Sequence, residues 1–127
     1  MLGLAGICMR TVLLVDDSPV VRHVLAPRLA SEGFLVREAA AAADVHDSDA
    51  SLLACAIIDL ELDDRDGTDV AAALLARRRS LPVAFFTASG DSLLRERAQA
   101  HGPVFDKPNV EAIVAWAKQA AQPPPTK

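Results

Sequence analysis

TVLLVDDSPVVR, the stretch from Thr11 to Arg22, contains the signals that decide the fold. Its first five residues, Thr11–Val15, form a continuous apolar run typical of a strand buried on both faces of a sheet. After two aspartates, Ser18 is placed to cap a helix whose first residue is Pro19. A buried strand that leads directly into a helix predicts an α/β fold with a parallel sheet.

The same alternation of apolar runs and helical patterns continues outward from this segment. Further strands are expected at Phe34–Glu38, Leu52–Asp59, Pro82–Thr87 and Pro103–Asp106. Helices are expected from Pro19 to a stop at Gly33, and at Ala39–Val45, Thr68–Arg79, Leu93–Ala100 and Asn109–Ala121. Five such strand–helix units predict a doubly wound α/β fold around a five-stranded parallel sheet.

Composition excludes several classes of protein. A length of 127 residues, 51% hydrophobic and 24% charged, suits one globular domain. The net charge of −4 and scattered basic residues argue against nucleic-acid binding by this chain alone. No apolar run is long enough to span a membrane. The two cysteines, Cys8 and Cys55, cannot build a disulfide scaffold, which indicates a reducing, cytoplasmic location.

Polar side chains stand where the predicted strands end. Asp16 and Asp17 follow the first strand, Asp59 ends the third, Thr87 ends the fourth, and Lys107 follows the fifth. Sites in doubly wound folds lie at this edge of the sheet, so the five side chains are expected to converge. Clustered carboxylates repel one another unless a cation compensates, and an all-oxygen ligand set favours Mg²⁺ over zinc. A metal, a carboxylate and an ammonium together suit phosphoryl transfer.

Four motifs in this order resemble the receiver domain of two-component response regulators. They are VDDSPVVR (Val15–Arg22), IIDLELDDRDG (Ile57–Gly67), FFTAS (Phe85–Ser89) and DKP (Asp106–Pro108). The resemblance extends from about Arg10 to Ala121 and implies the CheY-like, flavodoxin-like (βα)5 fold. Receiver domains are signalling domains rather than classical enzymes, and support their own Mg-dependent phosphorylation and dephosphorylation.

The resemblance implies a metal site and a phosphoacceptor. Asp59 would accept a phosphoryl group from a histidine kinase or a phosphotransfer protein. Asp16 and Asp17 would hold Mg²⁺ together with Asp59 and the backbone carbonyl of Glu61. The phosphorylated domain would signal through a downstream protein partner that the sequence does not identify.

The resemblance also implies groups that contact the phosphoryl oxygens. These are the Thr87 hydroxyl, the backbone N–H of Ala88 and the Lys107 ammonium. Pro108 would set the conformation of the loop behind Lys107, often through a cis peptide bond.

The sequence departs from the family at two positions. Asp63 stands where proline is usual, within the acidic loop Glu61–Asp66. Val104 stands where an aromatic residue usually moves with Thr87 upon phosphorylation, although a β-bulge would bring Phe105 there instead. We therefore expect a small conformational change, centred on the loop after Thr87 and on a short fourth helix.

The departure at Val104 leaves a second interpretation open, a pseudo-receiver that acts as a constitutive protein-binding module. A metal-dependent phosphatase is a third, disfavoured because no D-x-D-x-T follows a strand. We expect residues 1–9 to be an extension, with translation effectively beginning at Met9, and residues 122–127 to be a proline-rich tail around the domain at 10–121. Trp116 is expected to pack at the edge of the last helix.

Overall fold

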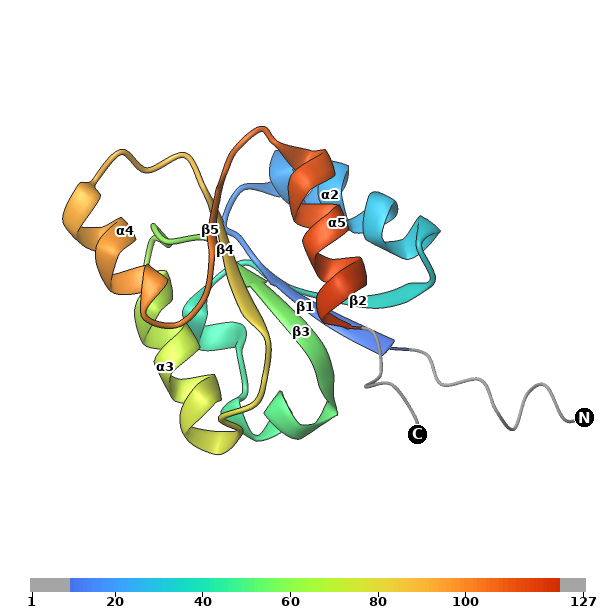
Figure 1. Ribbon diagram of the computed structural model, residues 1–127, viewed down its shortest axis with the longest axis horizontal. Helices are drawn as coiled ribbons and strands as arrows, with labels where there is room; N and C mark the ends of the chain where they lie inside the picture. The colour runs from blue at the N-terminus through green and yellow to red at the C-terminus, as the bar shows by residue number, and fades with distance from the viewer. Residues whose placement is uncertain (1–9, 122–127) are drawn as a thin grey trace, which may run out of the picture.

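The computed structural model describes residues 10–121, and Figure 1 shows one twisted sheet covered by helices on both faces. The expectations for the extension at 1–9, including Met9, and for the tail at 122–127 lie outside these described residues. All five strands pair in parallel in the order β2-β1-β3-β4-β5. The strands are β1 (Arg10–Val15), β2 (Phe34–Ala39), β3 (Leu53–Ile58), β4 (Val83–Thr87) and β5 (Val104–Asp106). The doubly wound fold expected from the sequence is confirmed.

The helices divide the core into two layers. They are α2 (Pro19–Ser31), α3 (Gly67–Arg77), α4 (Ser92–Gln99) and α5 (Val110–Ala120). Val12 and Leu14 of β1 pack with the buried residues of α2 and α5, whereas Leu13 and Val15 pack with those of α3 and α4. Successive side chains of a strand point to opposite faces, so a strand buried on both sides must be continuously apolar. This is why the TVLLV run predicts a central strand.

The first helix begins and ends as its sequence predicts. The Ser18 hydroxyl accepts a hydrogen bond from the Val21 N–H at 3.3 Å, and Pro19 is the first helical residue. Beyond the end of α2, Gly33 adopts a φ of 95°, a left-handed conformation that glycine reaches without steric cost. This turn reverses the chain into β2.

The prediction of a helix at Ala39–Val45 is wrong. Strand β2 extends through Ala39, and two 3-10 turns follow, η1 (Ala42–Asp44) and η2 (Asp47–Leu52). The Asp64 carboxylate accepts hydrogen bonds from the N–H groups at the start of η1, both at 3.0 Å. A run of a few alanines is too short to repay the cost of nucleating an α-helix, and this external acceptor holds the tighter turn instead.

The segment between β4 and β5 holds only a short helix, as expected. Helix α4 has 8 residues and is capped by Asp91, whose carboxylate accepts from the N–H groups of Leu93 and Leu94 at 3.1 Å. Trp116 lies partly buried on α5 against the core layer of α2 and α5, which agrees with edge packing. Among the described residues, no helix has the length and apolar character needed to cross a membrane.

Candidate functional site

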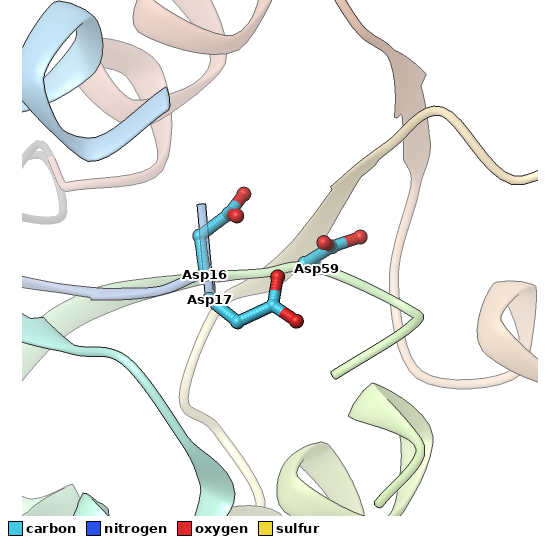
Figure 2. Close-up of side chains that lie close together, drawn as sticks. All are labelled: Asp16, Asp17 and Asp59. Carbon is cyan, nitrogen blue, oxygen red and sulfur yellow. The ribbon is translucent and has the colours of Figure 1, made fainter. Parts of the chain in front are cut away.

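Three carboxylates meet at the carboxyl edge of the two central strands (Figure 2). Asp16 and Asp17 follow β1, and Asp59 follows β3; one oxygen from each lies within 4.8 Å of the others. The backbone holds them there: the Asp59 N–H donates to the Val15 carbonyl at 2.9 Å. Asp16 and Asp59 are buried, with 1% and 6% of their surface exposed, while Asp17 is half-buried.

Lys107 supplies the positive charge at this cluster. Its Nζ lies 2.9 Å from Asp16 Oδ2 and 3.2 Å from Asp59 Oδ2, so one ammonium bridges the two buried carboxylates. The Lys107 N–H also donates to the Thr87 carbonyl at 2.9 Å, which fixes the backbone at the end of β5. The peptide bond between Lys107 and Pro108 is cis.

Burial and charge compete at these groups. Burial first, and then the charge of Asp16, raise the pKa of Asp59, and the nearby ammonium of Lys107 offsets only part of this effect. Burial alone would lower the pKa of Lys107. The hydrogen bond to Asp16 and the charges of Asp59 and Asp16 outweigh it, so the pKa of Lys107 is raised. The lysine therefore stays charged, next to an anionic cluster that remains under-compensated.

Thr87 ends β4 beside this cluster, and its side chain is almost fully buried. Its hydroxyl oxygen accepts a hydrogen bond from the Ser89 N–H at 3.1 Å, and Ala88 between them is exposed. Val104 pairs with Phe85 in a regular parallel register, so no bulge brings Phe105 to its position.

The backbone of Gly67 at the start of α3 lies against the phosphoacceptor candidate. A Cβ at Gly67 would stand 2.0 Å from the Asp59 carbonyl oxygen, far inside contact distance. The Gly67 N–H donates to the Leu60 carbonyl at 2.7 Å and closes the loop between β3 and α3. Gly67 is the glycine at the end of the motif Ile57–Gly67. Its close contact with the Asp59 carbonyl arises only when the loop between β3 and α3 folds, so the sequence does not reveal it.

Arg22 and Asp63 also reach the site, in contacts that the sequence does not predict. Arg22 Nε donates to the Asp16 carbonyl at 2.9 Å, and its guanidinium lies 3.5 Å from Glu38. The Asp63 carboxyl lies beside Asp17, whose hydrogen bond and charge raise the pKa of Asp63. Position 63 therefore extends the acidic cluster toward solvent.

The chemistry of this donor set fits Mg²⁺. Three carboxylates from two rigid strands converge, two of them are buried, and a cation, the Lys107 ammonium, already lies between two of them. Hard oxygen ligands in an open arrangement are those that magnesium prefers. The residues that would hold the ion are Asp16, Asp17 and Asp59.

The fold and the site together define a CheY-like α/β domain with an acidic cation site at the carboxyl edge of its sheet. The family model described as the response regulator receiver domain matches residues 12–111. The chain belongs to this family, whose members are signalling domains of two-component systems.

Individual relatives agree with this assignment. The chain is 35% identical over 88 residues to the transcriptional regulatory protein GltR of Pseudomonas aeruginosa, a match that covers 65% of this chain and 35% of GltR. The matched region is thus about a third of that relative. The CheY-like receiver domain protein of Methanospirillum hungatei has a TM-score of 0.81 at 20% identity, over 90% of this chain and 94% of that one. The BeF3-activated receiver domain of DrrB has a TM-score of 0.78 at 21% identity, over 89% and 97%.

Proposed function

We propose that Asp59 accepts a phosphoryl group from a histidine kinase or a phosphotransfer protein, and that the modified domain binds a downstream protein. The observation that carries this proposal is the Asp59 carboxylate itself. It is buried among carboxylates at the sheet edge, yet it is paired with a lysine at 3.2 Å. In its ionised form such a carboxylate is a nucleophile beside a cation that can offset the charge of an incoming phosphoryl group.

The transfer step moves one phosphoryl group and one electron pair. An Asp59 oxygen attacks phosphorus, the bond from phosphorus to the donor imidazole nitrogen breaks, and its electron pair stays on that nitrogen. The Lys107 ammonium then pairs with a phosphoryl oxygen, and the Thr87 hydroxyl and the Ala88 N–H donate to others. A Mg²⁺ ion held by Asp16, Asp17, Asp59 and the Glu61 carbonyl would offset further negative charge on those oxygens.

Intact mass spectrometry tests the proposal. The chain is incubated with Mg²⁺ and acetyl phosphate, and we expect a gain of one phosphoryl group. Asp59→Ala should abolish the gain, whereas the control Glu96→Gln, an exposed carboxylate on α4 outside the acidic cluster, should keep it. No gain in the unmodified chain, or an equal gain in Asp59→Ala, would overturn the proposal.

The alternative is a constitutive protein-binding module, and Val104 is the observation that favours it. A valine in regular register on β5 lacks the ring that family members use to transmit phosphorylation. The same experiment separates the two functions, because a constitutive module would gain no phosphoryl group.

A further inference from the structure

The side chain of Glu61 takes no part in the function proposed above, yet it bridges two loops of the site. Its backbone N–H donates to Asp59 Oδ1 at 3.3 Å, which places the residue directly beside the phosphoacceptor candidate. Its carboxylate accepts a hydrogen bond from the Ser89 hydroxyl at 2.8 Å. Glu61 therefore joins the loop after β3 to the loop after β4.

Ser89 is the junction of that second loop. It is 7% exposed, and each of its polar groups has a partner. Its N–H donates to the Thr87 hydroxyl oxygen at 3.1 Å, its own hydroxyl oxygen accepts from the Asp91 N–H at 3.2 Å, and its carbonyl accepts from Arg95 Nη1 at 2.9 Å. A shift of Ser89 would therefore disturb both Thr87 and α4.

Arg95 extends this connection to the edge of the sheet. Its second guanidinium nitrogen, Nη2, donates to Asp106 Oδ1 at 2.7 Å, and its side chain is 27% exposed. Arg95 thus ties α4 to β5 as well as to the Ser89 carbonyl. The described contacts run without a break from Asp59 through Glu61 and Ser89 to Arg95.

We propose that the hydrogen bond between Glu61 and Ser89 is a charge-sensitive latch that holds the loop after β4 in its resting conformation. The inference rests on the proposed function. A phosphoryl group on Asp59 adds a dianion two residues before Glu61, whose backbone N–H already contacts the Asp59 carboxylate, and the added charge repels the Glu61 carboxylate. Glu61 is exposed and can turn into solvent, which leaves the Ser89 hydroxyl without its acceptor.

Release of the latch frees the loop after β4 and the start of α4. The Thr87 hydroxyl turns to a phosphoryl oxygen at the same time, so Ser89 loses a hydrogen bond on each side. Arg95 then loses its fixed acceptor on this loop, and the start of α4 is freed. This polar route does not require an aromatic residue at Val104. Glu61 is here a positioning residue and makes no bond to the phosphoryl group.

Amide NMR with beryllofluoride and Mg²⁺, which mimic the phosphoryl group, tests the latch. Glu61→Gln keeps a hydrogen-bond acceptor for Ser89 but removes the charge, so the latch should stay closed. We expect the beryllofluoride-induced shift change at Arg95 to fall roughly threefold or more in this variant, because the ligand no longer biases the two states of the latch. The Ser89 amide should still respond, because its bond to the Thr87 hydroxyl is lost in either case. Changes next to Asp59 should persist, and Glu96→Gln, an exposed control on α4, should respond like the unmodified chain.

Ser89→Ala supplies the opposite signature. It removes the latch outright, so without beryllofluoride its Arg95 amide should already be displaced toward the position that the unmodified chain reaches with beryllofluoride. An undiminished change at Arg95 in Glu61→Gln, or no such displacement in Ser89→Ala, would overturn the latch while leaving the proposed function intact. If beryllofluoride fails to shift the neighbours of Asp59 in the unmodified chain, the proposed function fails and the latch with it.

Discussion

Asp59→Asn is expected to stabilise the metal-free protein, although it removes an ion pair. At an effective dielectric constant of about 20, two carboxylate charges at the 4.8 Å upper limit of this cluster repel by about 3.5 kcal/mol. Asp59 has two such neighbours, Asp16 and Asp17. Its attraction to the Lys107 ammonium at 3.2 Å is favourable by about 5 kcal/mol and offsets most of the two repulsions. Because Asp17 is half-buried and partly screened, the net gain in the free energy of unfolding is about 1–2 kcal/mol.

The pH dependence of this gain has a definite sign. The pKa of Asp59 is raised in the folded protein, so the unmodified chain loses stability as the pH rises through that pKa and the carboxyl ionises. Asn carries no charge at any pH. The difference between the two proteins should therefore reach its full size above the raised pKa of Asp59, and should disappear below the ordinary aspartate pKa of 3.8, where the carboxyl is neutral in both states.

Urea unfolding in EDTA measures the effect. Trp116 is the single tryptophan and is partly buried, so its emission reports the transition. Added Mg²⁺ should stabilise the unmodified chain more than Asp59→Asn, because the variant lacks one of the three carboxylates. Glu96→Gln on the exposed face of α4 is the control for losing any carboxylate. An Asp59→Asn protein that is no more stable than the unmodified chain in EDTA at neutral pH would refute the electrostatic argument.

Three further predictions test the packing of the domain. Gly67→Ala should cost about 1–3 kcal/mol in urea unfolding, because its Cβ must displace the Asp59 carbonyl 2.0 Å away; an unchanged midpoint would contradict this. Cys55 is fully buried, and burial raises the pKa of its thiol to about 12. In a Cys8→Ser background, a thiol reagent should label it only as fast as the protein unfolds, and rapid labelling of the native protein would show the reasoning to be wrong. Arg78→Ala should lower the free energy of unfolding by about 1.5–3 kcal/mol, because the guanidinium donates to two backbone carbonyls at 3.1 and 2.6 Å. A negligible change in urea unfolding would contradict this role.

The sequence predicts structure best where the environment of a residue follows from its neighbours in the chain. Short continuous apolar runs that alternate with helical patterns favour strands buried on both faces, and the polar residue after each run then stands at one edge of a parallel sheet. This is why the sequence alone places Asp16, Asp59 and Lys107 together. The short α4 followed in the same way from the length of chain available between Thr87 and Lys107.

Prediction fails where a distant residue decides the local conformation. Ala39–Val45 has the composition of a helix, but its turns are held by the carboxylate of Asp64, which follows β3. The bond between Glu61 and Ser89 joins residues 28 apart in the chain, and its geometry depends on how two loops settle over the sheet. No pattern of residue types encodes such a contact.

The order of the strands divides the candidate site into a stiff half and a compliant half. The carboxylates stand on β1 and β3, each of which is paired on both sides, whereas Lys107 follows β5, an edge strand of 3 residues bonded only to β4. Small opening motions of the sheet begin at such edges. An opening at this edge would move the Lys107 ammonium, whereas the carboxylates would keep the spacing that the two central strands give them. The anionic half of the site is thus held by the middle of the sheet, and its tethered cation by a strand with a single partner.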